Sequence, residues 1–325
     1  MSVLVTGGCG YIGAHVVRLL SEAGSETVVV DDLSTGSSER VQGSRSFELD
    51  IAAPSAADAL AGIMIDESVD AVIHLAAKKQ VGESVERPLR YYRQNVDGAL
   101  NVADAALRAR VERFVFSSTA AVYGAVEHDF VDEHAPTDPI NPYGRTKLVG
   151  EWVLRDLARA SGMRAVTLRY FNVAGAGWPD LGDPQVLNLV TLVIDRIRRG
   201  ELAQVYGDDF PTLDGSGVRD YIHVLDLANA HLAALAYLDD PAPRHDLFNV
   251  GTGVGSSVLE VIAAIARVSG RDVPIEVLPR RVGDAASVVA DPSRITGALG
   301  WRATRDLDEI VRSAWEAAES GSRRS

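Results

Sequence analysis

Several features are scarce or missing in this chain of 325 residues. It has a single cysteine, Cys9, so no disulfide bond can form within the chain; one cysteine fits a reducing compartment. No apolar run approaches the roughly 20 residues that span a bilayer. The opening stretch MSVLVTGG has neither the basic segment nor the apolar segment of a secretory signal. These absences predict a cytoplasmic protein with no membrane partner.

Positive charge is also scarce. Lys and Arg together number 32 against 45 Asp and Glu, which gives a formal net charge of −13. The negative electrostatic field of a protein with this net charge disfavours nucleic acids and anionic membranes as partners. To bind an anionic substrate, the protein would need local positive charge. None of the seven histidines has a metal-ligand spacing such as H-E-x-x-H, so we predict no metal site.

The pattern of apolar residues predicts an α/β fold. In the first half, short β-branched runs alternate with segments of helical spacing, which is typical of a parallel sheet built from βαβ units. After about Asn172 the loops become richer in Gly, Pro and Asp. We therefore expect a doubly wound parallel sheet over residues 1–172, rejoined by about 218–250, and a smaller mixed α/β substrate-binding lobe over 173–325.

A glycine-rich loop follows the first predicted strand. Gly7-x-x-Gly10-x-x-Gly13 opens a helix, as in Rossmann domains, where glycines allow a tight turn and close approach of a pyrophosphate to the helix N-terminus. Asp31 lies 18 residues after Gly13, at the end of the second strand, where it can accept hydrogen bonds from a ribose diol. A carboxylate there would repel a 2′-phosphate, so the sequence favours NAD over NADP. Asp50, after a further short strand, could face the adenine. The alternative for the three glycines is an ordinary Gly-rich turn. The alternative for Asp31 and Asp50 is that they are solvated carboxylates in turns.

A second motif carries acid–base chemistry. The segment from Asn141 to Lys147 opens a helix with an Asn N-cap and Pro in the first turn. Tyr143 and Lys147 are four residues apart and so lie on one helix face. A free tyrosine has a pKa near ~10, and a nearby ammonium would lower it toward use as a base. Thr119, which follows the strand over 113–117, could share a proton with Tyr143. The alternative for Tyr143 and Lys147 is a surface tyrosine packed on the lysine side chain. The alternative for Thr119 is a residue at a strand end that bonds only to backbone groups.

Together these residues resemble the extended short-chain dehydrogenase/reductases. Further stretches are similar to the UDP-galactose 4-epimerases, and the resemblance runs from Val3 to about Trp315. The stretches that carry it are Lys79–Val85, Arg169–Asn172, Tyr206–Thr212, Gly217–Val224 and Pro279–Asp284.

The resemblance implies reversible 4-epimerisation of UDP-galactose and UDP-glucose through a transient 4-keto sugar, with tightly bound NAD and no net redox change. Residues 1–172 would then be an NAD-binding Rossmann domain and residues 173–325 a nucleotide-sugar-binding lobe. The implied catalytic residues are Tyr143, Lys147 and Thr119. The implied cofactor-binding residues are Gly7, Gly10, Tyr11, Ile12, Gly13, Asp31, Asp50, Ile51, Lys79, Asn95, Tyr143, Lys147 and Tyr170. The implied substrate-binding residues are Thr119, Tyr143, Asn172, Asn188, Tyr206, Arg219, Arg281 and Asp284. The family also implies a homodimer.

The sequence departs from the family pattern in the substrate loop. Leu189 replaces an expected asparagine, and the proline that follows in relatives is absent. Val288 aligns where some relatives carry a bulky Tyr, which leaves room for a UDP-N-acetylhexosamine. A UDP-pentose 4-epimerase is a close alternative. Because Ala120 and Ala121 are inert, a 4,6-dehydratase or a decarboxylase is less favoured. A non-catalytic NAD-binding regulator is least favoured, because Tyr143, Lys147 and Thr119 are all present.

Overall fold

The chain divides into two compact units. The structure, a computed structural model, describes residues 1–126, 130–242, 245–281 and 283–322. The first unit comprises residues 1–124, 136–169 and 228–248, and the second comprises residues 125–135, 170–227 and 249–325. Each unit is therefore built from several stretches of sequence.

The first unit contains a seven-stranded sheet. Its strands are β1 (Ser2–Thr6), β2 (Glu26–Asp31), β3 (Arg45–Glu48), β4 (Ala71–His74), β5 (Arg113–Thr119), β7 (Arg164–Tyr170) and β11 (His245–Val250). They lie in the order β11-β7-β5-β4-β1-β2-β3, and the pairs from β3 to β5 run parallel. Since β1 lies between β2 and β4, the strand order reverses beside β1. In open α/β sheets, ligands bind at the carboxyl ends of the strands at such a reversal.

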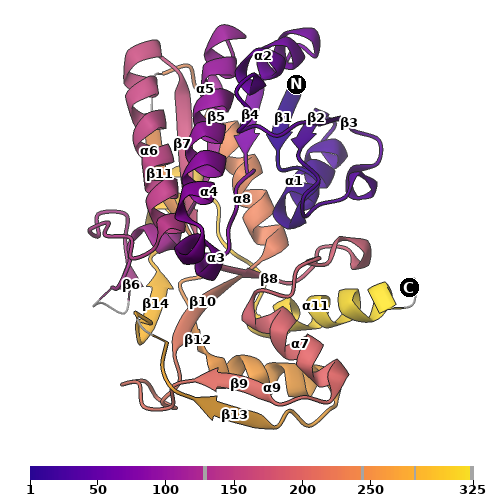
Figure 1. The fold of residues 1–325 in the computed structure, drawn as a ribbon, viewed down its shortest axis with the longest axis vertical. Coiled ribbons are helices and arrows are strands. Elements are labelled where there is room, and N and C mark those ends of the chain that lie inside the picture. Colours follow the sequence, from indigo (N-terminus) through magenta and orange to yellow (C-terminus); the bar gives the residue numbers. More distant parts are fainter. Residues whose placement is uncertain (127–129, 243–244, 282, 323–325) are drawn as a thin grey trace. The chain divides into compact units, whose positions relative to one another are not determined.

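Helices cover both faces of this sheet (Figure 1). They are α1 (Tyr11–Glu22), α2 (Ala56–Asp66), α3 (Val81–Glu86), α4 (Pro88–Tyr91), α5 (Gly98–Arg108), α6 (Pro142–Ser161) and α8 (Val224–Tyr237), with a π-helical segment over Tyr92–Asp97. Leu4 and Phe116 of the sheet share a buried cluster with Leu60 of α2, Val102 of α5 and Leu154 of α6. Short 3-10 helices span Ser38–Val41 and Ala120–Val122. The predicted doubly wound sheet is confirmed.

The second unit is mixed α/β, as expected. Its strands are β6 (Phe130–Val131), β8 (Asn172–Ala174), β9 (Ala203–Tyr206), β10 (Val218–His223), β12 (Gly255–Ser257), β13 (Ile275–Leu278) and β14 (Ser287–Ala290). Strand β10 pairs in parallel with β8 and β14 and antiparallel with β12, while β9 and β13 form a separate parallel pair. Its helices are α7 (Leu189–Arg199), α9 (Val258–Ser269), α10 (Ser293–Leu299) and α11 (Leu307–Ser322), with a 3-10 turn at Pro179–Leu181. Apolar residues of α7, α9 and α11 form its core.

Local sequence signals explain where the key helices begin. Asn141 caps α6, because its side-chain oxygen accepts a hydrogen bond from the Gly144 N–H at 2.9 Å. Ser257 and Glu260 form a capping box at the start of α9. In the described part of the chain, no helix is long and apolar enough to cross a membrane.

Candidate active site

The glycine loop of the first unit forms a cradle between β1 and α1. Gly7 has φ +70°, and a Cβ there would come within 2.7 Å of the Ala76 nitrogen. A Cβ on Gly13 would lie 2.1 Å from the Gly7 carbonyl oxygen, so only glycine lets α1 pack this closely. At Gly10 a Cβ would meet, among described atoms, only the Gly7 oxygen at 3.3 Å, so this side of the loop is open. The cradle fits a pyrophosphate at the helix N-terminus.

Asp31 ends β2 and is buried beside the cradle. Its carboxylate accepts hydrogen bonds from the backbone N–H of Cys9 at 3.0 Å and of Leu33 at 2.9 Å. Burial raises the pKa of Asp31, while the two N–H groups favour the carboxylate and oppose this shift. Each carboxylate oxygen can accept more than one hydrogen bond. The Asp31 carboxylate therefore fits a ribose diol, and the cradle beside it fits a pyrophosphate, which are two parts of a dinucleotide.

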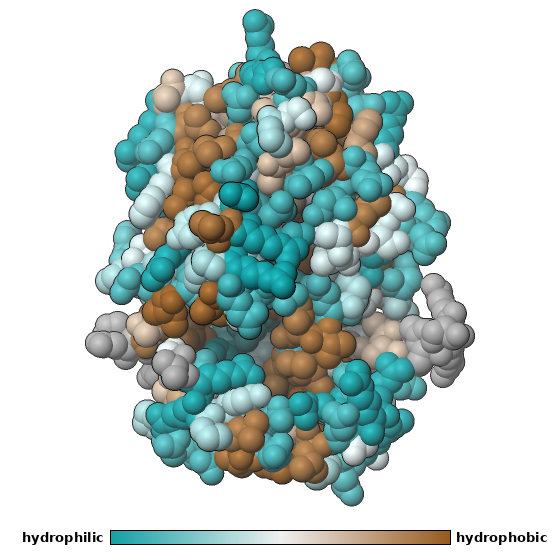
Figure 2. All heavy atoms as spheres, viewed as in Figure 1, coloured by the Kyte–Doolittle hydropathy of each residue, from teal (hydrophilic) through white to brown (hydrophobic). Residues whose placement is uncertain are grey.

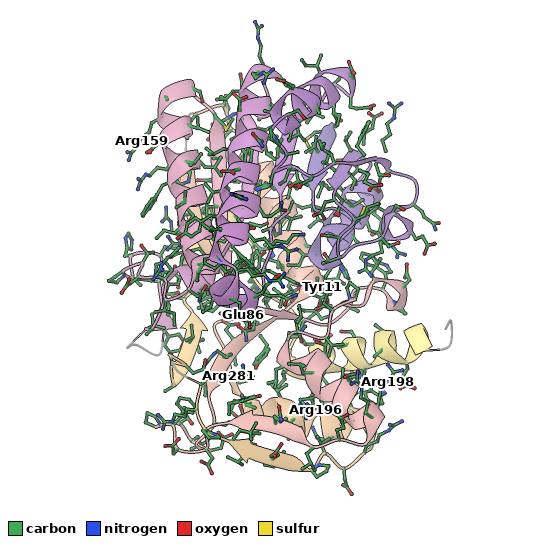
Figure 3. All side chains as sticks on the ribbon, viewed as in Figure 1. Tyr11, Glu86, Arg159, Arg196, Arg198 and Arg281 are labelled. Carbon is green, nitrogen blue, oxygen red and sulfur yellow. The ribbon has the colours of Figure 1, made fainter. Side chains whose placement is uncertain are left out.

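The other predicted cofactor residues differ in their surroundings. Asp50 is exposed and accepts a hydrogen bond from the Ala52 N–H at 2.9 Å. The Ile51 side chain is buried in the apolar cluster beneath α5. Exposed Lys79 lies with its Nζ 5.9 Å from the ring centroid of Tyr11, a residue labelled in Figure 3.

Asn95 lies in the π-helical segment and is buried. Its amide donates to the Lys78 carbonyl at 3.0 Å and to Thr146 Oγ1 at 2.9 Å, and its Oδ1 accepts from the Lys78 N–H at 2.8 Å. Asn95 thus ties the loop after β4 to α6, and its side chain is engaged with protein groups. The remaining predicted cofactor residue, Tyr170, lies at the end of β7, in the second unit.

Thr119, Tyr143 and Lys147 come together in the first unit. Thr119 ends β5, and its side chain forms a hydrogen bond with Tyr143 on the first turn of α6. One turn later, Lys147 Nζ donates to the Ser117 carbonyl at 2.8 Å. All three side chains are buried, with exposed fractions of 8%, 7% and 3%. The arrangement can move a proton through Tyr143 with Thr119 as its hydrogen-bond partner.

Burial dominates the electrostatics of this group. It raises the pKa of Tyr143 to about 12, although the hydrogen bond from Thr119 favours the phenolate. It lowers the pKa of Lys147 to about 7, although Glu151 favours the ammonium. The chain's own groups alone therefore do not make Tyr143 a base at neutral pH. An added positive charge beside Tyr143 would favour the phenolate.

The second unit gathers arginines near the end of β9 and along β10. The Arg219 guanidinium donates to the carbonyls of Val218 at 2.8 Å and Ala285 at 3.0 Å, and it faces Asp284 at 3.5 Å. The Arg281 guanidinium, labelled in Figure 3, lies 3.7 Å from the ring centroid of Tyr206. The predicted substrate residues Tyr206, Arg219, Arg281 and Asp284 therefore form two contacting pairs within this unit.

The remaining substrate predictions lie on β8 and α7 of the same unit. Asn172 opens β8, and its side chain is hydrogen-bonded to Tyr221. Asn188 is the N-cap of α7, accepting from the Thr191 N–H at 3.0 Å and donating to Asp183 at 3.0 Å. Leu189 is the first residue of α7 and packs against the apolar core. Asn188 thus has a structural role at the helix end.

Sequence reasoning missed several buried or bridging charges. Lys78 Nζ bonds to Asp32 at 3.0 Å, although only Lys79 had been singled out. Glu151 and Arg169 form an ion pair at 2.6 Å with side-chain exposures of 4% and 5%. Asp220 accepts hydrogen bonds from the N–H groups of Thr252, Gly253 and Ala290. The available signal was position: Glu151 is four residues after Lys147, and Asp220 adjoins Arg219.

In the described residues no group of three or more His, Cys, Asp or Glu side chains could hold a metal ion. His74 is buried and bonds to Thr6 Oγ1 at 2.7 Å. His223 bonds to Ser313 Oγ at 3.0 Å and accepts from the Leu225 N–H. Both histidines therefore have structural partners.

Comparison with known proteins finds relatives that cover nearly the whole chain. Residues 3–251 match the NAD dependent epimerase/dehydratase family. A UDP-glucose 4-epimerase of Azospirillum brasilense is 47% identical over 97% of this chain and 91% of its own length. The crystal structure of a UDP-glucose 4-epimerase from Stenotrophomonas maltophila, with bound NAD and formylated UDP-arabinopyranose, is 42% identical, covers 100% of both chains and has a TM-score of 0.93. That of the Brucella ovis enzyme in complex with NAD is 42% identical, covers 97% of both chains and has a TM-score of 0.91.

Proposed function

The chain belongs to the NAD dependent epimerase/dehydratase family, and on this premise we propose that it is a UDP-glucose 4-epimerase. It interconverts UDP-galactose and UDP-glucose through a transient 4-keto sugar, with no net redox change. The observation that carries this proposal is the buried group of Thr119, Tyr143 and Lys147 at the carboxyl end of β5. The relatives described above, with NAD and UDP-sugars, support it.

The chain's own residues move the proton. Tyr143 takes the proton of the sugar 4-hydroxyl and later returns it, with Thr119 as its hydrogen-bond partner. Lys147 contributes positive charge beside the phenolate and is anchored by the Ser117 carbonyl. Bound NAD supplies hydride acceptance and return at C4, together with the positive charge that favours the phenolate. Asp31 and the Gly7–Gly13 cradle hold its ribose and pyrophosphate.

Arginines of the second unit bind the substrate diphosphate. Arg219 and Arg281 offer guanidinium groups suited to bidentate phosphate contact, in a chain whose net charge is −13. Backbone carbonyls orient Arg219, and the Tyr206 ring supports Arg281. The nucleotide ribose is assigned to Asp284, and the sugar or phosphate to Asn172 and Asn188. Asp50, Ile51, Lys79, Asn95 and Tyr170 are assigned to the cofactor.

A homodimer and a cytoplasmic location complete the proposal. Apolar side chains are exposed on α5 and α6, where Figure 2 shows hydrophobic residues at the surface of the first unit. Leu100 and Leu107 of α5 and Trp152 of α6 are 45%, 36% and 47% exposed. Burial of these side chains against a second copy would stabilise a dimer. The location is inferred from the single cysteine.

The test is direct. Purified protein is incubated with UDP-galactose and no added cofactor, and UDP-glucose is followed by chromatography. Conversion is expected, because the NAD remains bound through purification. Tyr143→Phe should lose turnover by roughly 10²–10⁴-fold and keep its NAD, since only the phenolic hydroxyl is removed. If Tyr143→Phe epimerises at the wild-type rate, or if the wild type fails to convert with NAD supplied, the proposal is wrong.

A further inference from the structure

Three successive residues of β5 pair with three residues on one face of α6. Thr119 is hydrogen-bonded to Tyr143, and the Ser117 carbonyl accepts from Lys147 at 2.8 Å. Between them, Ser118 Oγ donates to Glu151 Oε1 at 2.5 Å. Tyr143, Lys147 and Glu151 are spaced by four residues and so lie along one stripe of the helix. Glu151 belongs to the same strand–helix contact as the proton-transfer residues, and the proposed chemistry leaves it without a role.

Glu151 is also bound by an arginine from a neighbouring strand. Arg169 Nε donates to its Oε1 at 2.9 Å and Arg169 Nη2 to its Oε2 at 2.6 Å. The Arg169 guanidinium also lies 4.8 Å from the ring centroid of Tyr123. A buried ion pair is weak evidence for a stabilising role, because desolvation offsets much of the attraction. The burial of this carboxylate, which accepts three hydrogen bonds, is therefore better explained by its effect on the neighbouring Lys147.

The groups around Lys147 come from several elements. On β5, the Phe116 ring centroid is 5.0 Å from Nζ, and the Ser117 carbonyl accepts a hydrogen bond from Nζ. From β4, His74 is neutral, because burial and the charge of Lys147 lower its pKa to about 3. From α8, His231 bonds to the Ser117 hydroxyl at 2.7 Å.

The neighbours on α6 itself are Tyr143 and Glu151, and from β7 Arg169 reaches Glu151. Among these groups of the described chain, Glu151 carries the negative charge. A fixed carboxylate near a buried amine favours the charged form of that amine.

We propose that Glu151, fixed by Arg169 and Ser118, is a positioning residue that favours the charged form of Lys147 beside Tyr143. The inference rests on the proposed function for its catalytic consequence. Burial lowers the pKa of Lys147 to about 7, and the Glu151 carboxylate opposes that shift. Without the carboxylate the amine would be largely neutral at pH 7 and would no longer stabilise a phenolate at Tyr143.

The small number of lysines makes the pKa of Lys147 measurable. The chain contains three lysines, Lys78, Lys79 and Lys147. Selective ¹³Cε,¹⁵Nζ labelling of lysine therefore gives three sets of NMR signals, and Lys147→Met assigns the third. The holoenzyme is titrated as wild type and as Glu151→Gln. The pKa of Lys147 should fall by about one unit or more in the variant, while those of Lys78 and Lys79 stay unchanged.

A second variant guards against misfolding. Glu151→Gln leaves Arg169 buried without its partner, so the double variant Glu151→Gln/Arg169→Gln is titrated as well. Replacing both members of a buried pair is often tolerated. Asp156→Asn, an exposed carboxylate on α6, is the matched control and should leave the Lys147 titration unchanged.

Activity supplies an independent readout. Activity falls as Lys147 loses its proton, so the alkaline limb of kcat/KM should move to lower pH in both Glu151 variants by the same shift as the NMR titration. An unchanged Lys147 titration in the folded variants, or a smaller kcat/KM with an unmoved limb, overturns the inference and leaves Glu151 a packing residue. If the wild type does not epimerise while the Lys147 titration shifts as expected, the proposed function fails and the electrostatic inference stands.

Discussion

Replacement of Gly13 by alanine tests how the fold creates its cofactor site. The added Cβ would lie 2.1 Å from the Gly7 carbonyl oxygen, 2.7 Å from Gly8 Cα and 2.9 Å from the Gly7 carbonyl carbon. All three are backbone atoms of the turn, so no side chain can rotate away. The start of α1 must shift outward from the loop, and the N–H groups of its first turn shift with it.

The expected magnitudes follow from this geometry. Overpacking of a close contact costs about 1–3 kcal/mol, and the higher helix propensity of alanine returns at most about 1 kcal/mol. The free energy of unfolding should therefore fall by up to about 2 kcal/mol. Displaced N–H donors should weaken NAD binding by at least about tenfold, which corresponds to about 1.4 kcal/mol.

Gly62 in α2 provides the matched control. A Cβ there would have no described heavy atom within 4 Å, and its φ is not positive. Gly62→Ala should raise the free energy of unfolding by about 0.5–1 kcal/mol through helix propensity alone. Urea denaturation and the NAD content of the purified proteins measure both effects. Wild-type stability and NAD content in Gly13→Ala would show that the loop is not packed as described.

Three further predictions concern other parts of the molecule. Asp220→Asn should lower the free energy of unfolding by about 2–4 kcal/mol in urea denaturation, because an amide NH₂ would face backbone N–H groups that now donate to a buried carboxylate; a loss no larger than that of Asp156→Asn would contradict this. Burial lowers the pKa of His74 to about 3 and of His223 to about 4, so the unfolded chain takes up protons that the folded chain does not. The free energy of unfolding should therefore fall as the pH drops below about 6.5, by up to about 1.4 kcal/mol per pH unit for each histidine. A urea midpoint that does not change between pH 7 and 5 would show that the two histidines are not held neutral in the folded protein. The resemblance aligns Val288, which pairs with Arg219 in the sheet, with a bulky Tyr of some relatives. If the smaller side chain admits a 2-acetamido group, the wild type should convert UDP-N-acetylgalactosamine, and Val288→Tyr should lose that activity while retaining the reaction of UDP-galactose. A wild type that does not convert UDP-N-acetylgalactosamine would rule this prediction out.

Local patterns predicted much of the fold. The strand expected over 113–117 is confirmed and runs two residues further, to Thr119. Thr119 is also the N-cap of the 3-10 helix that follows. Helix α7 begins at Leu189, because the side chain of Asn188 caps it. Capping and turn residues act on their immediate neighbours, so they can be read from sequence once the apolar period is known.

The chemistry-bearing residues were also visible in sequence. The glycine spacing, Asp31 and the Tyr143–Lys147 pair are local patterns whose geometry follows from a strand–turn–helix or from one helix face. The roles assigned to Asn172, Arg219, Arg281 and Asp284 remain predictions of the resemblance. Their contacts within the second unit, such as Arg281 on Tyr206, are findings of the structure.

The sequence by itself determined the periodic elements, the glycine loop and the placement of Tyr143 and Lys147 on one helix face, since each depends on residues within a few positions of one another. Only the tertiary structure decided which charged side chains are buried and which groups they form hydrogen bonds with. Glu151 meets Ser118 and Arg169 because α6 packs against β5 and β7. Asp220 meets Thr252 and Ala290 because β10 lies between β12 and β14. Burial and long-range pairing depend on how elements distant in sequence pack, and no local pattern records that.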